Sequence, residues 1–242
     1  MKTRVMSLMV VAALVIGAAS MAHADTYDLT VTNGWAPSGV TYATVTIVTN
    51  GGTLYDGSST CGSDICIEFS AVSGYQFFGN DSGAGAVGWN TDLTPGEDFT
   101  ASIDSCVANG GASCTYDSDG AHFDGFGDFN QNVYGGTGSS TGFNDVVINI
   151  AGSGLTLSDF INGSTGGNGD SANLFAAHIS PYPNPNGLCT GFTANTGARQ
   201  PSSYDSNLAQ CGGSQVPEPG SLMLFGTGLL GIAGFLRRKL LS

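Results

Sequence analysis

The chain has 242 residues, and its 38 glycines follow no three-residue register, which excludes a collagen-like fibre. Between residues 25 and 216 only Arg199 is basic, against 18 of the 19 acidic residues, so that portion carries a net charge of −17. Such a surface repels nucleic acids and anionic lipids, so neither is expected as a partner. It either attracts divalent cations or simply keeps the domain in solution.

The first 24 residues have the layout of a secretory signal peptide. Lys2 and Arg4 precede an apolar run from Val5 to Ala19, and Ala22-His23-Ala24 fits the small-x-small rule of a cleavage site. We expect cleavage before Asp25. The exported part that follows is long enough for one domain with a substantial core.

Residues 25–199 show the periodicity of β-strands. Apolar residues alternate with hydroxyl residues in some segments, and others are short β-branched or aromatic runs. The predicted strands are Tyr27 to Thr32, Thr41 to Thr49, Ile65 to Val72, Phe99 to Ile103 and Val146 to Ile150. No 12-residue stretch with helical periodicity precedes the C-terminal tail. The pattern predicts an all-β domain, a jelly-roll-like β-sandwich with glycine-rich loops.

Turn and loop signals separate these segments. The dipeptides and tripeptides that favour tight turns are Asn33-Gly34, Asn50-Gly51-Gly52, Pro95-Gly96 and Asn162-Gly163. Two longer segments, Asp81 to Gly96 and Ser180 to Gly187, are predicted to be surface loops. Residues 200–216 are predicted to form a polar stalk.

Six cysteines lie in the exported part, which indicates three disulfides in an oxidising compartment. Fifteen pairings are possible, and the spacing favours sequential pairs. These are Cys61 with Cys66, Cys106 with Cys114, and Cys189 with Cys211. The sequence contains no CxxC-type knuckle, so a zinc site is not expected.

An acidic run is the one candidate metal site. Asp117, Asp119, Asp124 and Asp128 fall within 12 residues and could supply oxygen ligands to calcium. The EF-hand pattern fails, because Ala121 occupies a ligand position and no glutamate ends the loop. The alternative is an acidic, solvated turn. No other cofactor is expected.

The sequence offers no enzyme signature. The exported part has two histidines, His122 and His178, but neither a G-x-S-x-G elbow nor an H-E-x-x-H helix. Trp35, Trp89 and Tyr134 are candidate aromatic platforms for carbohydrate. Because the catalytic motifs are missing, we predict a protein without enzymatic activity.

The last 26 residues, 217–242, have the layout of a membrane-sorting tail. Pro217-Glu218-Pro219 precedes an uncharged segment from Ser221 to Leu236, which would span about 24 Å as a helix. This predicts a transmembrane helix, slightly short for the hydrocarbon core. The basic residues Arg237, Arg238 and Lys239 follow as a stop-transfer signal and place the C-terminus in the cytoplasm.

This tail resembles the PEP-CTERM family, whose members are exported by Gram-negative bacteria and processed by an exosortase. The resemblance implies export across the inner membrane, transient anchoring there through the C-terminal helix, and delivery to the cell surface or extracellular matrix. It also implies the exosortase and the export machinery as partners, and an association with extracellular polysaccharide in a biofilm.

Four stretches of the domain look like an ectodomain often found ahead of such tails. They are FDGFGDFNQNVYGG (123–136), GFNDVVINIAGSG (142–154), LFAAHIS (174–180) and TGFTANTG (190–197). This second resemblance supports the fold and the location more than any activity. It implies that His178, within LFAAHIS, is a buried or strand-lining residue rather than a catalytic one. The expected function is that of a non-enzymatic surface or matrix protein. A carbohydrate- or calcium-binding adhesion module is the alternative, and a secreted polysaccharide hydrolase comes third.

Overall fold

The computed structural model describes residues 24–33, 36, 39–54, 60–79, 85–109, 113–135, 141–165, 173–182 and 190–195. Within these ranges the regular elements are 14 β-strands and one short 3-10 helix, η1 (Leu157–Phe160). Every pairing between named strands is antiparallel. The predicted all-β fold is confirmed.

Five strands form a first layer in the spatial order β1-β3-β4-β12-β7. Their bounds are Ala24–Leu29 for β1, Ala43–Thr49 for β3, Ile65–Ala71 for β4, Gly142–Gly152 for β12 and Phe99–Asn109 for β7. The period-two pattern explains the layer, because Val45 and Ile47 of β3 enter the core while Thr44 and Thr46 lie on the opposite face.

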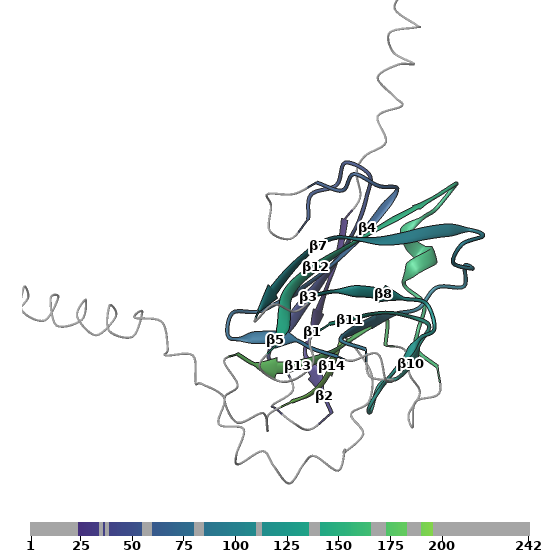
Figure 1. The fold of residues 1–242 in the computed structure, drawn as a ribbon. Coiled ribbons are helices and arrows are strands. Elements are labelled where there is room, and N and C mark those ends of the chain that lie inside the picture. Colours follow the sequence, from purple (N-terminus) through teal and green to yellow (C-terminus); the bar gives the residue numbers. More distant parts are fainter. Residues whose placement is uncertain are drawn as a thin grey trace, which may run out of the picture.

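Seven shorter strands form a second layer, which lies below β4, β7 and β12 in the view of Figure 1. Their bounds are Tyr75–Phe77 for β5, Phe175–Pro181 for β13, Val87–Trp89 for β6, Gln131–Tyr134 for β11, Thr115–Asp117 for β8, Gly191–Ala194 for β14 and Val31–Thr32 for β2. One pairing, Phe143 with Phe77, joins β12 to β5. Hydrogen bonding therefore runs through both layers as one 12-stranded sheet.

Aromatic side chains fill the space between the two layers. Phe69 of β4 packs against Trp89 of β6 and Phe175 of β13, with ring centroids 6.1 and 5.9 Å apart. All three side chains are fully buried. Because each buried aromatic of this size contributes roughly 1.5–3 kcal/mol, this cluster holds the layers face to face.

A separate hairpin covers the outer face of the second layer. It consists of β9 (Ala121–Phe123) and β10 (Gly127–Phe129), which pair with each other and with no other named strand. Phe123 and Phe129 pack edge-to-face at 5.2 Å, and Phe123 also packs on Phe192 of β14. Together with Ala176 and Ala194 they form a second buried cluster.

Two predicted loops contain strands. Asp81 to Gly96 was expected on the surface, but Val87 and Trp89 within it belong to β6 and are fully buried between β11 and β13. Likewise, β13 continues through Ser180 to Pro181, which pairs with Tyr75. The predicted turns at Gly51 and Gly96 are confirmed, with φ angles of 79° and 83°. Asn162 instead forms a β-bridge with Asn90.

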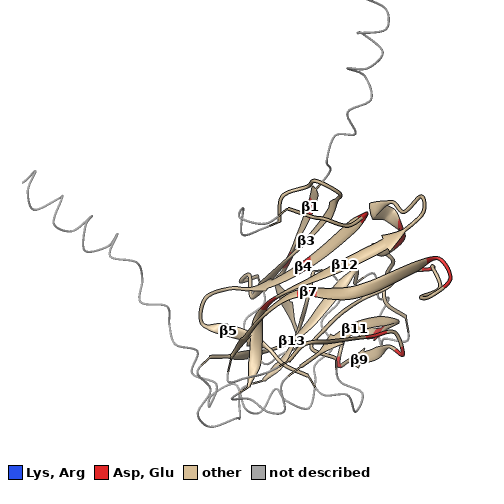
Figure 2. Cartoon of the chain, turned by 45° about the horizontal axis from the view of Figure 1, so that its top comes forward, with Lys and Arg blue, Asp and Glu red and all other residues tan. Residues whose placement is uncertain are grey.

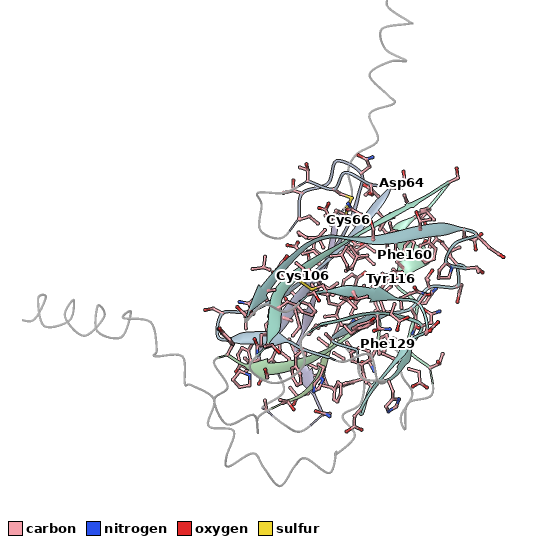
Figure 3. All side chains as sticks on the ribbon, viewed as in Figure 1. Asp64, Cys66, Cys106, Tyr116, Phe129 and Phe160 are labelled. Carbon is pink, nitrogen blue, oxygen red and sulfur yellow. A yellow bond between two sulfur atoms is a disulfide. The ribbon has the colours of Figure 1, made fainter. Side chains whose placement is uncertain are left out.

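Two of the three predicted disulfides are present. Cys61 is bonded to Cys66 at the start of β4, with Cα atoms 5.6 Å apart, and Cys106 of β7 to Cys114, with Cα atoms 6.2 Å apart. Figure 3 labels Cys66 and Cys106 on these strands. The third predicted pair, Cys189 with Cys211, lies outside the described residues.

The targeting segments also lie outside the described part. This applies to residues 1–23 of the predicted signal peptide, to the stalk and to the predicted transmembrane segment from Ser221 to Leu236. Among the described residues, no helix is long and apolar enough to cross a membrane. Figure 2 shows acidic residues and no basic ones on the described ribbon, in keeping with the sequence, which has no lysine or arginine in those ranges.

Candidate functional site

A polar groove of about 490 Å³ opens beside the β9–β10 hairpin. Three segments that are distant in the sequence build it: the chain leaving β6, the two sides of the hairpin, and the stretch from Asn162 to Thr165. Its lining is rich in amide, hydroxyl and carboxylate groups. The residues are Asn90, Thr91, Asp92, Asp119, Gly120, Ala121, His122, Asp128, Phe129, Asn130, Asn162, Gly163 and Thr165.

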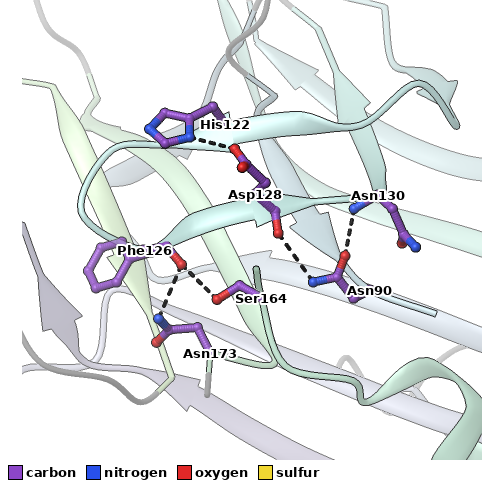
Figure 4. A network of polar contacts seen from close by, with 7 residues as sticks. All are labelled: Asn90, His122, Phe126, Asp128, Asn130, Ser164 and Asn173. Atoms are coloured by element: carbon purple, nitrogen blue, oxygen red, sulfur yellow. Dashed lines mark hydrogen bonds and ion pairs between the residues drawn. The ribbon is translucent and has the colours of Figure 1, made fainter. Parts of the chain in front are cut away.

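Asn90 fixes the floor of the groove. Its buried side chain accepts a hydrogen bond from the Asn130 amide at 2.6 Å. Its Nδ2 donates to the carbonyl oxygens of Asp128 at 3.3 Å and Gly163 at 3.1 Å. Figure 4 shows how this one side chain faces β10. Because all of these bonds involve backbone groups of other segments, Asn90 ties three pieces of chain together.

Asn130 and Thr91 form a second tie beside it. The Thr91 amide donates to Asn130 Oδ1 at 3.1 Å, and Asn130 Nδ2 donates back to the Thr91 carbonyl at 2.6 Å. The Thr91 hydroxyl accepts a bond from the Leu93 amide. These polar groups therefore hold the backbone and are not free to contact a ligand.

Hydrogen bonds from two other segments anchor the turn of the β9–β10 hairpin. The Phe126 carbonyl accepts hydrogen bonds from Ser164 Oγ at 2.7 Å and from Asn173 Nδ2 at 3.3 Å, which Figure 4 also shows. The backbones of Asp128 and Thr165 exchange two further bonds. The hairpin and the Asn162–Thr165 stretch therefore form one rigid wall.

Gly120 shapes the entrance to β9. Its φ angle is 84°, which side-chain-bearing residues rarely adopt, and a Cβ there would lie 2.8 Å from the Phe129 carbonyl oxygen. Just before it, the Asp119 amide donates to Asp117 Oδ1 at 2.9 Å, the bond of an Asx turn. This tight turn brings Asp119 to the rim of the groove.

Across the hairpin, His122 Nδ1 lies 2.6 Å from Asp128 Oδ1. Both side chains are more than half exposed, at 58% and 55%. The interaction therefore orients two groups at the groove surface rather than supporting the core.

The four aspartates predicted to bind calcium do not form one ligand set. Asp119 and Asp128 line the groove. Asp117 instead accepts a hydrogen bond from the Asp119 amide, and Asp124 lies in the hairpin turn outside the lining. In the part of the chain that the structure describes, no three His, Cys, Asp or Glu side chains gather closely enough to hold a metal ion. Calcium binding by these residues stays a prediction without support from this arrangement.

His178 lies away from the groove, on β13. Its ring stacks on Phe192, with ring centroids 4.3 Å apart, and contacts the tilted ring of Phe78 at 3.9 Å. Burial lowers the pKa of His178 to about 3, because the apolar surroundings penalise the charged form. Its predicted place lining a strand is confirmed.

Of the predicted sugar-stacking aromatics, Trp89 and Tyr134 do not line the groove. Trp89 is a fully buried core residue that stacks on Tyr116, so its suggested role as a sugar platform is wrong. Tyr134 is half-buried at the end of β11. Trp35 lies outside the described residues.

Asn90, Asn130 and Thr165 were not predicted from the sequence. Each lies in or beside a short turn segment, which is the only local signal for such residues. The hydrogen bonds that bring Asn90 and Asn130 to the groove span 38 to 73 positions of the chain.

A comparison with protein families finds the PEP-CTERM protein-sorting motif at residues 215–239. The match includes Pro217-Glu218-Pro219 and the basic residues through Lys239, so the predicted recognition is confirmed. The motif indicates an exported protein that undergoes exosortase-dependent processing and is sorted toward the envelope of a Gram-negative bacterium. No curated protein and no solved structure matches the chain.

Proposed function

We propose that this PEP-CTERM protein is exported across the inner membrane, held there briefly by its C-terminal segment, and released to the cell surface or extracellular matrix, where it associates with polysaccharide. The sorting motif at residues 215–239 is the observation that carries the proposal. The predicted signal peptide before Asp25 and the transmembrane segment from Ser221 to Leu236 supply the two membrane steps.

The folded domain is compatible with that extracellular location. Its two disulfides fit an oxidising compartment. We infer that the two facing layers constitute a jelly-roll-like β-sandwich closed by hydrogen bonds at one side. The third predicted bridge, Cys189 with Cys211, would tie the end of this domain to the stalk.

We propose binding rather than catalysis as the role of the domain. The groove walls are held by hydrogen bonds, as at Asn90, and most groups around the floor are already used by the protein itself. A carbohydrate-binding module is the second candidate, because the groove and its polar lining favour binding of a polar ligand. Neither proposal includes hydrolysis, and calcium binding is not part of either.

The sorting step is tested in the native host. Replacing Pro217, Glu218 and Pro219 with alanine should leave signal cleavage intact and leave a membrane-held precursor that retains the tail. The control replaces Ser202 and Ser203 of the stalk with alanine and should mature normally. Mass spectrometry of both ends reads out processing, and normal maturation of the first variant would contradict the proposal.

The association is tested separately. The mature protein should co-sediment with the polysaccharide secreted by its host and should release no reducing ends from it. Peptide mapping without reductant on the same sample tests the pairing of Cys189 with Cys211. A protein that stays entirely in the supernatant, or that shortens the polymer, would overturn the proposed role.

A further inference from the structure

The groove beside the β9–β10 hairpin contains acceptor groups that form no hydrogen bond within the described part of the chain, next to side chains that hold the backbone in place. The side chains of Asn90 and Asn130 are fully engaged in holding the backbone. By contrast, no hydrogen bond within the described residues uses the carboxylates of Asp92 and Asp119 or the second oxygen of Asp128. All three line the groove and are exposed.

We propose that this groove binds glycans that carry free ammonium groups, such as polymers of de-N-acetylated hexosamine. The inference rests on the proposed association with polysaccharide and names the ligand class. The hydroxyl groups of the glycan also take part, because Asn162 and Thr165 of the lining offer them an amide and a hydroxyl beside the carboxylates. A ligand rich in donors matches a site rich in acceptors.

Charge separates this ligand from acidic glycans. The described part of the chain contains no lysine or arginine, so no such cation lies within it to neutralise Asp92 or Asp119, whereas Asp128 is paired with His122 through one of its oxygens. A uronic-acid polymer would meet like charges along the groove, whereas an ammonium group donates up to three hydrogen bonds and is attracted to any one of these carboxylates.

The aromatic groups of the groove separate it from a site for neutral sugars. Stacking on a neutral pyranose needs an exposed ring face. Phe129 contributes to the wall but is only 1% exposed, because its ring packs on Phe123 in the buried cluster. His122 is exposed, but its ring is tied to Asp128. Recognition therefore depends on charge and hydrogen bonds.

Calorimetric titration of the mature protein at low ionic strength tests the ligand class. The probes are a glucosamine oligomer, the N-acetylglucosamine oligomer of equal length, a galacturonate oligomer and oligolysine. We expect the glucosamine oligomer to bind more tightly than each of the others. Equal binding of the N-acetylated oligomer would overturn the ligand class, and equal binding of oligolysine would show a charge effect without glycan recognition.

A matched pair of variants tests the place. Asp92→Asn with Asp119→Asn should weaken glucosamine-oligomer binding about two- to fivefold per carboxylate, as for exposed ion pairs. Glu97→Gln with Asp104→Asn removes the same charge from exposed positions outside the groove and should change binding less than about twofold. Equal losses in both variants would overturn the groove as the site.

The outcomes also separate this inference from the proposed function. A protein that co-sediments with host polysaccharide but ignores the glucosamine oligomer would contradict the ligand class and leave the association standing. A protein that binds the oligomer at the groove but never co-sediments with the host polymer would contradict the proposed function instead.

Discussion

His122 and Asp128 are register partners across the β9–β10 hairpin, and their side chains meet at 2.6 Å on its solvent face. The neighbouring residues Phe123 and Phe129 point the other way, into the cluster against β14. The hairpin therefore has a polar face that borders the groove and an apolar face that attaches it to the sheet. Its stability should depend mainly on the apolar face.

Breaking the polar pair should have a small effect on folding. Both side chains are more than half exposed, so Asp128→Asn or His122→Gln should each change the free energy of unfolding by less than about 1 kcal/mol. Urea unfolding measures both variants, and the double variant gives the coupling between them. A coupling of several kcal/mol would show that the pair supports the fold.

Changing the apolar face should have a larger effect. Gly88 of β6 lies under the hairpin, and a Cβ there would come within 2.6 Å of Phe123 Cε2. Gly88→Ala must displace the Phe123 ring and should destabilise the domain by about 1–3 kcal/mol. Hydrogen exchange at the hairpin amides should rise with it.

Gly62→Ala is the matched control for Gly88→Ala. A Cβ at Gly62 would meet no atom within 4 Å, and Gly62 is not among the glycines with positive φ. The control should be neutral or slightly stabilising, since alanine restricts the unfolded chain. If both variants behave alike, the hairpin does not pack on β6 as described.

Local pattern predicted the long strands but not β6. The segments around β3, β4 and β12 each carry several alternating or β-branched residues, and all form strands. By contrast, β6 has three residues, one of them Gly88, and it follows a glycine-rich stretch. Its burial comes from β11 and β13, which lie more than 40 positions further along the chain. A contact of that range leaves no periodic signal in so short a segment.

The groove was only partly predictable for a related reason. The spacing of Asp117, Asp119, Asp124 and Asp128 suggested one loop with converging carboxylates. The chain instead forms an Asx turn and a hairpin, and successive residues of a strand point to opposite faces. Asn90 joins the site from 38 positions away, through its hydrogen bond to the Asp128 carbonyl. Composition alone cannot indicate such a partner.

The two disulfides should differ in their contribution. Loop entropy alone predicts about 2 kcal/mol for each, slightly more for Cys106–Cys114 because its separation is 8 residues rather than 5. Burial predicts the opposite order. Cys61 and Cys66 are buried in a cluster with Val48, Leu54 and Val147, whereas Cys106 and Cys114 are only partly buried.

We expect burial, rather than loop entropy, to determine which disulfide contributes more stability. Replacing Cys61 and Cys66 together with alanine leaves a cavity in addition to the lost cross-link, so this variant should lose more stability than the Cys106→Ala, Cys114→Ala variant. The urea midpoints of the two double variants give the order. A larger loss for the Cys106 pair would mean that loop entropy dominates.

His178 should make the domain sensitive to acid. Its pKa is lowered from 6.5 to about 3 by burial, so the unfolded chain binds a proton that the folded chain excludes between those values. Its contribution to stability is therefore complete above about pH 6.5 and is lost as the pH falls toward 3. The slope from this one group is up to about 1.4 kcal/mol per pH unit.

His178→Phe should reduce that slope, because phenylalanine keeps a ring between Phe78 and Phe192 but binds no proton. Urea unfolding at a series of pH values between 7 and 4 gives the slope for each protein. The control, His122→Gln, replaces the exposed histidine and should retain the acid sensitivity of the parent. If the His178→Phe variant loses stability with acid as steeply as the parent does, carboxylates and not His178 set the acid response.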